Sequence, residues 1–235
     1  MRVFDRAQAR IVGGFTSDSR TNRRLTKLTH AGFLKRFYLG RNGVGAPAFY
    51  TLTRLGAWTA EVESRSPRRM RDEVLFADAF TQHQLVINAV YLKLKYQPLP
   101  EGLMFKRWIV FREPIAHAVP LIPDGYAEVQ TPQELEALFL EVDLGNEHLH
   151  IWRKKAKQYL NFALYGQFNQ LFHLRRFRVL VVVNSLRRIM WLRKAVAKVT
   201  SKIFFFATID EINRDGVFGT RWLRPTSEER QALLS

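Results

Sequence analysis

Two short apolar runs constrain the fold of this 235-residue chain more than any other feature. Residues 177–183 (FRVLVVV) and 203–209 (IFFFATI) are too short to cross a bilayer, and their β-branched and aromatic composition is typical of buried strands. The basic amphipathic pattern of residues 186–200 predicts a helix between them. A buried strand, a helix and a second buried strand form the pattern of a crossover in an α/β sheet.

The residues ahead of this crossover extend the pattern to a mixed sheet. The predicted elements are, in order, a helix at 72–95, strands at 108–113, 121–129 and 138–144, and a helix at 147–168. A meander followed by crossovers favours an α/β domain and, with the N-terminal elements, an α+β protein. Residues 64–72 (SRSPRRMRD) are polar, basic and interrupted by proline, which predicts a linker. We therefore place domains at 1–70 and 71–235.

The charge of the chain indicates a polyanionic partner. There are 37 Lys and Arg against 21 Asp and Glu, and the formal net charge is +16. Residues 1–72 hold 15 of these cations and only five of the acids. Nucleic acid is the simplest partner for such a surface, although basic charge can also serve solubility alone. The lack of cysteine excludes disulfides and thiol catalysis, and no signal peptide is visible, so we expect a cytoplasmic protein with no membrane partner.

The first 70 residues begin with two predicted helices. Asp5 is expected to cap a short helix that ends at two glycines. The apolar residues expected to face inward on it are Ala7, Ile11 and Val12. Ser17 or Asp18 is expected to cap a second helix, which ends at Gly32.

Four cations share one face of the second helix, at positions i, i+3, i+4 and i+7. They are Arg20, Arg23, Arg24 and Lys27. Thr21, Leu25 and Leu28 lie on the opposite face and are expected to pack inward. Like charges on one stripe repel each other, and a phosphate backbone would turn that cost into attraction. The alternatives are a basic helical hairpin that binds protein and a solvated charged face.

A β-hairpin follows, with strands predicted at 33–39 and 48–52 around a glycine-rich tip. Helix, turn, basic helix and hairpin is the order of a winged helix-turn-helix, in which the second helix enters the major groove and the wing touches the backbone. Lys35, Arg36 and Arg41 would supply further cations near the wing. A usual winged helix has one more helix in front, which here is absent, replaced by a partner or lost from the N-terminus.

Three acids are expected to meet at the edge of the second domain's sheet. Asp124 follows a proline at the start of one strand, and Glu141 and Asp143 stand two apart on the next, so both leave the same face. Converging carboxylates repel unless a cation neutralises them, and oxygen ligands suit Mg²⁺ or Mn²⁺. The following helix carries Lys154, Lys155 and Lys157, and one of these lysines reaching back would orient a water or stabilise a developing phosphate charge.

At these residues the chain resembles the replication-relaxation family of bacterial plasmids and mobile elements. The matching segments are TNRRLTKLTHAGFLKR with FYTLTRLG, HQLVINAV at 83–90, PDGYAEV at 123–129, LEVDLGNE at 140–147 and KKAKQY at 154–159. The resemblance covers nearly the whole chain. It implies a role in plasmid DNA handling and a second domain of the restriction-endonuclease-like, PD-(D/E)xK nuclease fold.

The nuclease resemblance also implies a site. The nuclease pattern has a lysine two residues after the glutamate, where this chain has Asp143. Lys155 stands four residues before Tyr159, where RecB-type relatives have a glutamine, and His83 resembles in position the histidine of their first helix. The implied site is His83, Asp124, Glu141, Asp143 and Lys155, with Asp124, Glu141 and His83 as metal ligands.

Two readings of the whole protein stay open. In the first, a plasmid or mobile-element protein binds double-stranded DNA and cleaves it with Mg²⁺ or Mn²⁺. In the second, the nuclease-like domain is inactive and binds DNA or a replication or mobilisation protein.

Single residues also have structural alternatives. His83 is alternatively a hydrogen-bonded helix residue, and Asp143 a structural acid paired with Lys154 or Lys155. Pro123-Asp124-Gly125 is also an ordinary turn sequence. A stripe on the helix at 186–200 is either a phosphate track or a solvated face. Its cations are Arg187, Lys194 and Lys198.

Overall fold

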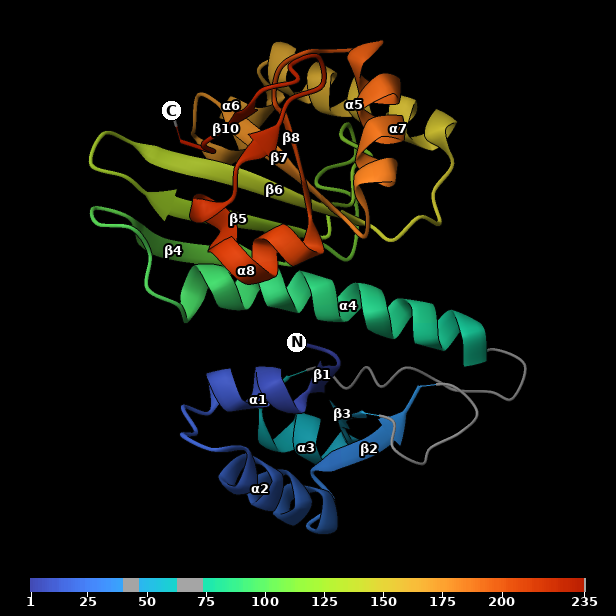
Figure 1. Ribbon diagram of the computed structural model, residues 1–235, viewed down its shortest axis with the longest axis vertical. Coiled ribbons are helices and arrows are strands. Elements are labelled where there is room, and N and C mark those ends of the chain that lie inside the picture. Colours follow the sequence, from blue (N-terminus) through green and yellow to red (C-terminus); the bar gives the residue numbers. More distant parts are fainter. Residues whose placement is uncertain (40–46, 63–73, 235) are drawn as a thin grey trace. The chain divides into compact units, whose positions relative to one another are not determined.

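The computed structural model describes residues 1–39, 47–62 and 74–234 (Figure 1). They form two compact units, Met1–Leu92 and Lys93–Ser235. The linker predicted at residues 64–72, the glycine-rich tip and Arg41 lie outside the described residues.

The first unit combines helices with a small antiparallel sheet. Its elements are β1 (Phe4–Asp5), α1 (Arg6–Val12), α2 (Asp18–His30), β2 (Leu34–Tyr38), β3 (Ala48–Leu52), α3 (Arg54–Thr59) and most of α4 (Val74–Lys95). The strand order is β1-β3-β2, and Leu34 pairs with Leu52 at one end of the hairpin. The predicted helices and hairpin are therefore present. The strand β1 was not predicted, because a two-residue strand has no periodicity to detect.

The helix caps expected from the sequence are confirmed. Asp5 accepts a hydrogen bond from the backbone N–H of Gln8 at 2.8 Å and so begins α1. Ser17, the first of the two expected candidates, caps α2 by accepting a bond from the backbone N–H of Arg20. On α2, Thr21 and Leu25 are buried as predicted.

The inward face predicted for α1 is wrong. The side chains of Ala7, Ile11 and Val12 are exposed. Gln8 is buried instead, and its side-chain amide donates to the backbone oxygen of Leu85 at 2.9 Å. A polar residue can occupy this position because a helix far along the chain satisfies its hydrogen bonds.

That distant helix is α4. Asn88 on α4 is buried and donates to the backbone oxygen of Val3 at 2.6 Å and to Gln8 Oε1 at 3.0 Å. Leu85 adds an apolar contact to a cluster with Val3 and the hairpin. The sequence-based boundary assigns this helix to the second domain, whereas the residues of the helix up to Leu92 belong to the first compact unit.

The second unit is built on a seven-stranded mixed sheet. Its further elements are β4 (Met104–Ile109), β5 (Gly125–Gln130), β6 (Leu135–Asp143), α5 (Leu149–Leu164), α6 (Gln167–Phe172), β7 (Phe177–Val183), α7 (Leu186–Ala197), β8 (Phe204–Thr208), α8 (Ile209–Gly219), β9 (Trp222–Leu223) and β10 (Arg230–Gln231). The strand order is β10-β9-β8-β7-β6-β5-β4. Strands β6, β7 and β8 are parallel and the others pair antiparallel, so the expected mixed α/β sheet and the α+β class are confirmed.

The core of this unit lies under α5, α6 and α7. These three helices cover one face of the sheet, and α8 lies on the other side (Figure 1). Phe139 on β6 is fully buried among aromatic residues of the helices and of β7. The same face of β6 carries Glu141 and Asp143, because side chains two apart on a strand point the same way.

Several predicted boundaries shift for local reasons. The helix expected at 147–168 is two helices, because Gly166 adopts a left-handed conformation (φ 71°) that ends α5 and begins α6. The strand expected from residue 121 begins at Gly125, since Pro123 has no N–H to donate to the sheet. The helix α8 was not predicted; the capping box of Thr208 and Glu211 is its sequence signal.

Candidate nucleic-acid interface and carboxylate site

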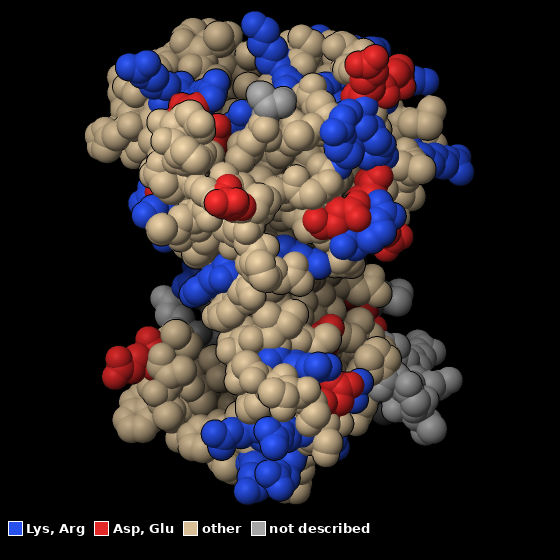
Figure 2. Space-filling model, turned by 60° about the vertical axis from the view of Figure 1, so that its left-hand side comes forward, with Lys and Arg blue, Asp and Glu red and all other residues tan. Residues whose placement is uncertain are grey.

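The four predicted cations of α2 are all exposed. We call Arg20, Arg23, Arg24 and Lys27 the cation stripe; Figure 2 shows Lys and Arg gathered at the lower end, where Figure 1 shows α2. Within the described residues, none of the four forms an ion pair. Asp18, the acid of the first turn, pairs with Arg6 and Arg10 of α1, each at 3.2 Å. The stripe therefore keeps its charge available to a partner.

The hairpin carries two of its three predicted cations on described residues. Lys35 and Arg36 on β2 are exposed, while Leu34 and Phe37 on either side are buried. The guanidinium of Arg36 lies 5.8 Å from the ring centre of Tyr38. Both side chains are therefore accessible to solvent, although neighbouring residues of a strand point to opposite faces.

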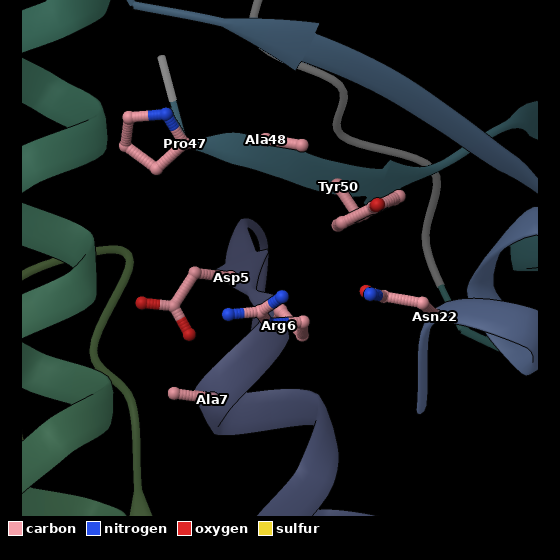
Figure 3. Close-up of a pocket in the computed structure, with 7 residues that line it drawn as sticks. All are labelled: Asp5, Arg6, Ala7, Asn22, Pro47, Ala48 and Tyr50. Atoms are coloured by element: carbon pink, nitrogen blue, oxygen red, sulfur yellow. The ribbon is translucent and has the colours of Figure 1, made fainter. Parts of the chain in front are cut away.

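A cavity of about 330 Å³ opens between the start of α1, α2 and β3. Figure 3 shows Asn22 of α2 with its amide directed toward Arg6 of α1, near Tyr50 of β3. Burial raises the pKa of the Tyr50 hydroxyl above its ordinary value. Because Arg6 is paired with Asp18, this cavity offers less free positive charge than the cation stripe.

In the second unit, Asp124 and Glu141 lie side by side. Gly125 pairs with Leu140 across the antiparallel strands, so the preceding Asp124 comes opposite Glu141. Asp124 Oδ2 accepts the backbone N–H of Val142 at 2.7 Å. Glu141 is 2% exposed; its Oε2 accepts a bond from Lys155 Nζ at 2.8 Å and its Oε1 from the Tyr159 hydroxyl at 2.6 Å.

The electrostatics of this carboxylate site follow from burial. Burial raises the pKa of Glu141 to about 7; Lys155 and Tyr159 oppose the rise and the charge of Asp124 adds to it. Burial also lowers the pKa of Lys155, but Glu141 and Glu147 outweigh it and raise that pKa above its ordinary value. The site therefore holds a charged lysine beside a carboxylate that is costly to ionise.

Asp143 is part of a different arrangement. Its side chain is fully buried, and its two oxygens accept four hydrogen bonds. The donors are Gly145 N at 2.6 Å, Trp152 Nε1 at 2.5 Å, Arg188 Nε at 3.0 Å and an Arg188 terminal nitrogen at 2.6 Å. These bonds use the four lone-pair positions of a carboxylate. This geometry favours the structural alternative for Asp143, with Arg188 as its partner rather than a lysine of α5.

His83 lies on the part of α4 that belongs to the first unit, whereas the carboxylates lie in the second unit. Among the described residues, no three His, Asp or Glu side chains gather as ligands of one ion. Sequence reasoning missed Glu147, which accepts a bond from Lys155 at 3.1 Å, and Arg188. Glu147 stands within the LEVDLGNE segment, whereas Arg188 gives no sequence signal of its role.

The fold and these sites define a two-unit α+β protein with a basic, exposed helix in one unit and a buried carboxylate–lysine site in the other. The chain belongs to the replication-relaxation family, whose model matches residues 3–174. The predicted family is thereby confirmed, and membership supports a role connected with the replication of plasmids or mobile elements.

The matched residues include the cation stripe, Asp124, Glu141 and Lys155, and end before β7 and α7. No curated protein and no solved structure matches the chain significantly. Within the described residues, no helix combines the length and the apolar character needed to cross a membrane.

Proposed function

We propose that the protein binds double-stranded DNA through its first unit, a winged helix-turn-helix in which α2 enters the major groove. The order β1, α1, α2, β2, β3 and the pairing of β1 with β3 support this reading. In it, Lys35 and Arg36 of the hairpin contact the phosphate backbone. Arg41, outside the described residues, remains a predicted contact of the wing.

The observation that carries the proposal is the cation stripe. Thr21 and Leu25 bury one face of α2, so the opposite face presents its four cations together to solvent. Their mutual repulsion destabilises the isolated helix, and neutralisation by phosphates with release of counterions would reverse that effect.

The test is duplex binding by the full chain, measured by fluorescence anisotropy over a range of salt concentrations. The double variant Arg23→Glu, Arg24→Glu is expected to lose most of its affinity. The charge-matched control, Lys106→Glu with Lys202→Glu, changes two exposed cations of the second unit and is expected to bind nearly as well. Equal losses in both variants, or a log affinity that does not vary with log salt, would refute the proposal.

A second candidate function is phosphodiester cleavage with a divalent cation at the carboxylate site. The residues fit such an ion: Asp124 and Glu141 supply adjacent hard oxygens, and each Glu141 oxygen has a second lone pair beyond the one that accepts a bond from Lys155 or Tyr159. Asp124 and Glu141 would hold Mg²⁺ or Mn²⁺, which supplies Lewis-acid activation of water and phosphate.

The residues of the chain have defined parts in this candidate reaction. Lys155 is held between Glu141 and Glu147, where its charge can stabilise a phosphate oxygen. Tyr159 orients Glu141, because burial and the neighbouring carboxylate raise its pKa and keep its hydroxyl a donor. Asp143, with its lone pairs used by Arg188 and other donors, is not assigned to the reaction.

Supercoiled plasmid incubated with the protein and Mg²⁺ or Mn²⁺ tests cleavage, with Asp124→Asn and Glu141→Gln as inactive variants. Thermal unfolding with and without Mn²⁺ tests ion binding separately. Cleavage by the wild type alone, with stabilisation by Mn²⁺, would support the reaction. Uncut plasmid without stabilisation would favour the inactive module that binds DNA or a replication or mobilisation protein.

A further inference from the structure

We infer that the exposed face of α7 binds single-stranded nucleic acid, with Trp191 as a stacking platform between cations. Four exposed side chains at positions i, i+4, i+7 and i+11 form what we call the α7 stripe. They are Arg187, Trp191 and Lys194 of α7 and Lys198, the residue that follows the last turn of the helix. This surface lies in the second unit, so the inference goes beyond duplex binding by α2 and does not depend on it.

The fold does not require the α7 stripe, because the opposite face of the helix supplies the packing. Ile189, Leu192 and Val196 are fully buried in the core. Ser185 caps the helix by accepting the backbone N–H of Arg188, and the Arg188–Asp143 ion pair fixes its first turn. The α7 stripe is therefore presented on a rigid support, and substitutions in it should leave the fold intact.

Trp191 is placed to stack with a base. Its side chain is 42% exposed, and the guanidinium of Arg187 lies 4.6 Å from the ring centre. Trp191 also borders a cavity of about 350 Å³ together with His148 and Leu149. An aromatic face beside cations is the usual combination in proteins that bind single strands, since every base has a π-face and every nucleotide a phosphate.

The cavity beside Trp191 adjoins the carboxylate site. Glu147 borders the cavity and also accepts a bond from Lys155 at 3.1 Å, while Lys155 in turn binds Glu141. Arg188 forms another part of the cavity wall. A strand stacked on Trp191 would thus pass close to Lys155 and Glu141.

The charge of α7 favours nucleic acid over a protein partner. The helix contains no Asp or Glu, so every charged side chain of the α7 stripe is positive. Leu186 and Met190 are also exposed beside the stripe, and exposed apolar side chains of this kind are what a protein interface would bury. Self-association through these two residues is accordingly one of the outcomes that the experiment must separate.

The first experiment measures binding of the full chain to a labelled oligothymidylate of about 20 nucleotides by fluorescence anisotropy, because single-strand sites span about 4–16 nucleotides. Trp191→Ala is expected to weaken binding at least about fivefold, and Trp191→Phe to retain most of the affinity. Tyr165→Ala, which removes another exposed aromatic of the same unit, is the matched control and is expected to bind like wild type.

The second experiment measures salt dependence and self-association. Lys194→Gln with Lys198→Gln is expected to reduce the slope of log affinity against log salt by about 1.4 for the single strand. A duplex probe run in parallel should respond to α2 variants instead, which separates failure of the inference from failure of the proposed function. Equal affinity of Trp191→Ala and Tyr165→Ala, or dimerisation abolished by Met190→Ser without single-strand binding, would overturn the inference.

Discussion

The cation stripe of α2 and the acids of β6 differ in burial and in how their charges are compensated. Arg23, Arg24 and Lys27 are exposed and, among described residues, have no acidic partner. Glu141 and Asp143 are buried, and Lys155 and Arg188 compensate them within the same unit. The charges of α2 are therefore accessible to a binding partner, whereas those of β6 form ion pairs that belong to the folded core.

The difference shows why charge alone does not identify a site. Exposed charges contribute little to folding because water and salt screen them, so their grouping is informative about binding. Buried charges need partners in the folded state, so an acid such as Asp143 can resemble a metal ligand in the sequence and serve the packing of a helix.

The largest expected effect concerns the buried pair. Asp143→Ala should lower the free energy of unfolding by about 3–5 kcal/mol, because it leaves Arg188 charged and buried without its partner. Urea denaturation of the full chain measures it. Asp215→Ala, which breaks the exposed pair with Arg214, is the control and should leave stability nearly unchanged. A loss below about 1 kcal/mol for Asp143→Ala would contradict the claim that the buried Asp143–Arg188 pair contributes more to stability than an exposed pair.

The next prediction uses pH. The folded pKa of Glu141 lies at about 7, above the value of 4.5 for a free glutamate, so the folded state binds this proton more tightly. Stability should therefore fall as pH rises from about 4.5 to about 7, by at most about 1.4 kcal/mol per pH unit. Glu141→Gln should flatten this dependence in urea unfolding at several pH values; an unchanged slope would contradict the assignment.

A single cation of the stripe should have a smaller effect. Lys27→Gln is expected to reduce the slope of log duplex affinity against log salt by about 0.9 and to weaken binding roughly eightfold at about 0.1 M salt, or by about 1.2 kcal/mol. Anisotropy titration measures both quantities. Lys106→Gln, on the edge strand β4, is the control. The same change of slope in both variants would mean that the stripe contributes only net charge.

The smallest effect is expected at the helix caps. Ser17→Ala and Ser185→Ala should each cost about 1 kcal/mol of stability, since each removes the hydrogen bond that begins a charged helix. Only Ser17→Ala should also weaken duplex binding, because α2 carries the cation stripe. Chemical denaturation and duplex titration of the two variants test this contrast, and equal weakening of duplex binding would oppose it.

Local signals predicted much of both units. The caps Asp5 and Ser17, the buried face of Thr21 and Leu25, and the strand over 177–183 follow from residue type and periodicity. The exposed cations of α2 followed from the same periodicity. Contacts between residues far apart could not be predicted this way, because no local pattern records which donor meets a given acceptor.

The candidate site illustrates this limit. The convergence of Asp124 and Glu141 was predicted from the strand pattern and the part of Lys155 from the family resemblance, and the structure brings these three residues together. The partner of Asp143 was not predicted, because Arg188 lies 45 residues further along the chain. Trp191 likewise joins the cavity beside Glu147 only through the crossover that positions α7.

The amino-acid sequence alone determined the family, the alternation of helices and strands, and the helix face on which the exposed cations lie, since each depends on short-range spacing. Tertiary structure decided that Asn88 and Leu85 of α4 complete the N-terminal core and that Glu141 and Asp143, two residues apart, have different partners. The physical reason is that a buried polar group must find its partner wherever the fold brings one within hydrogen-bond distance.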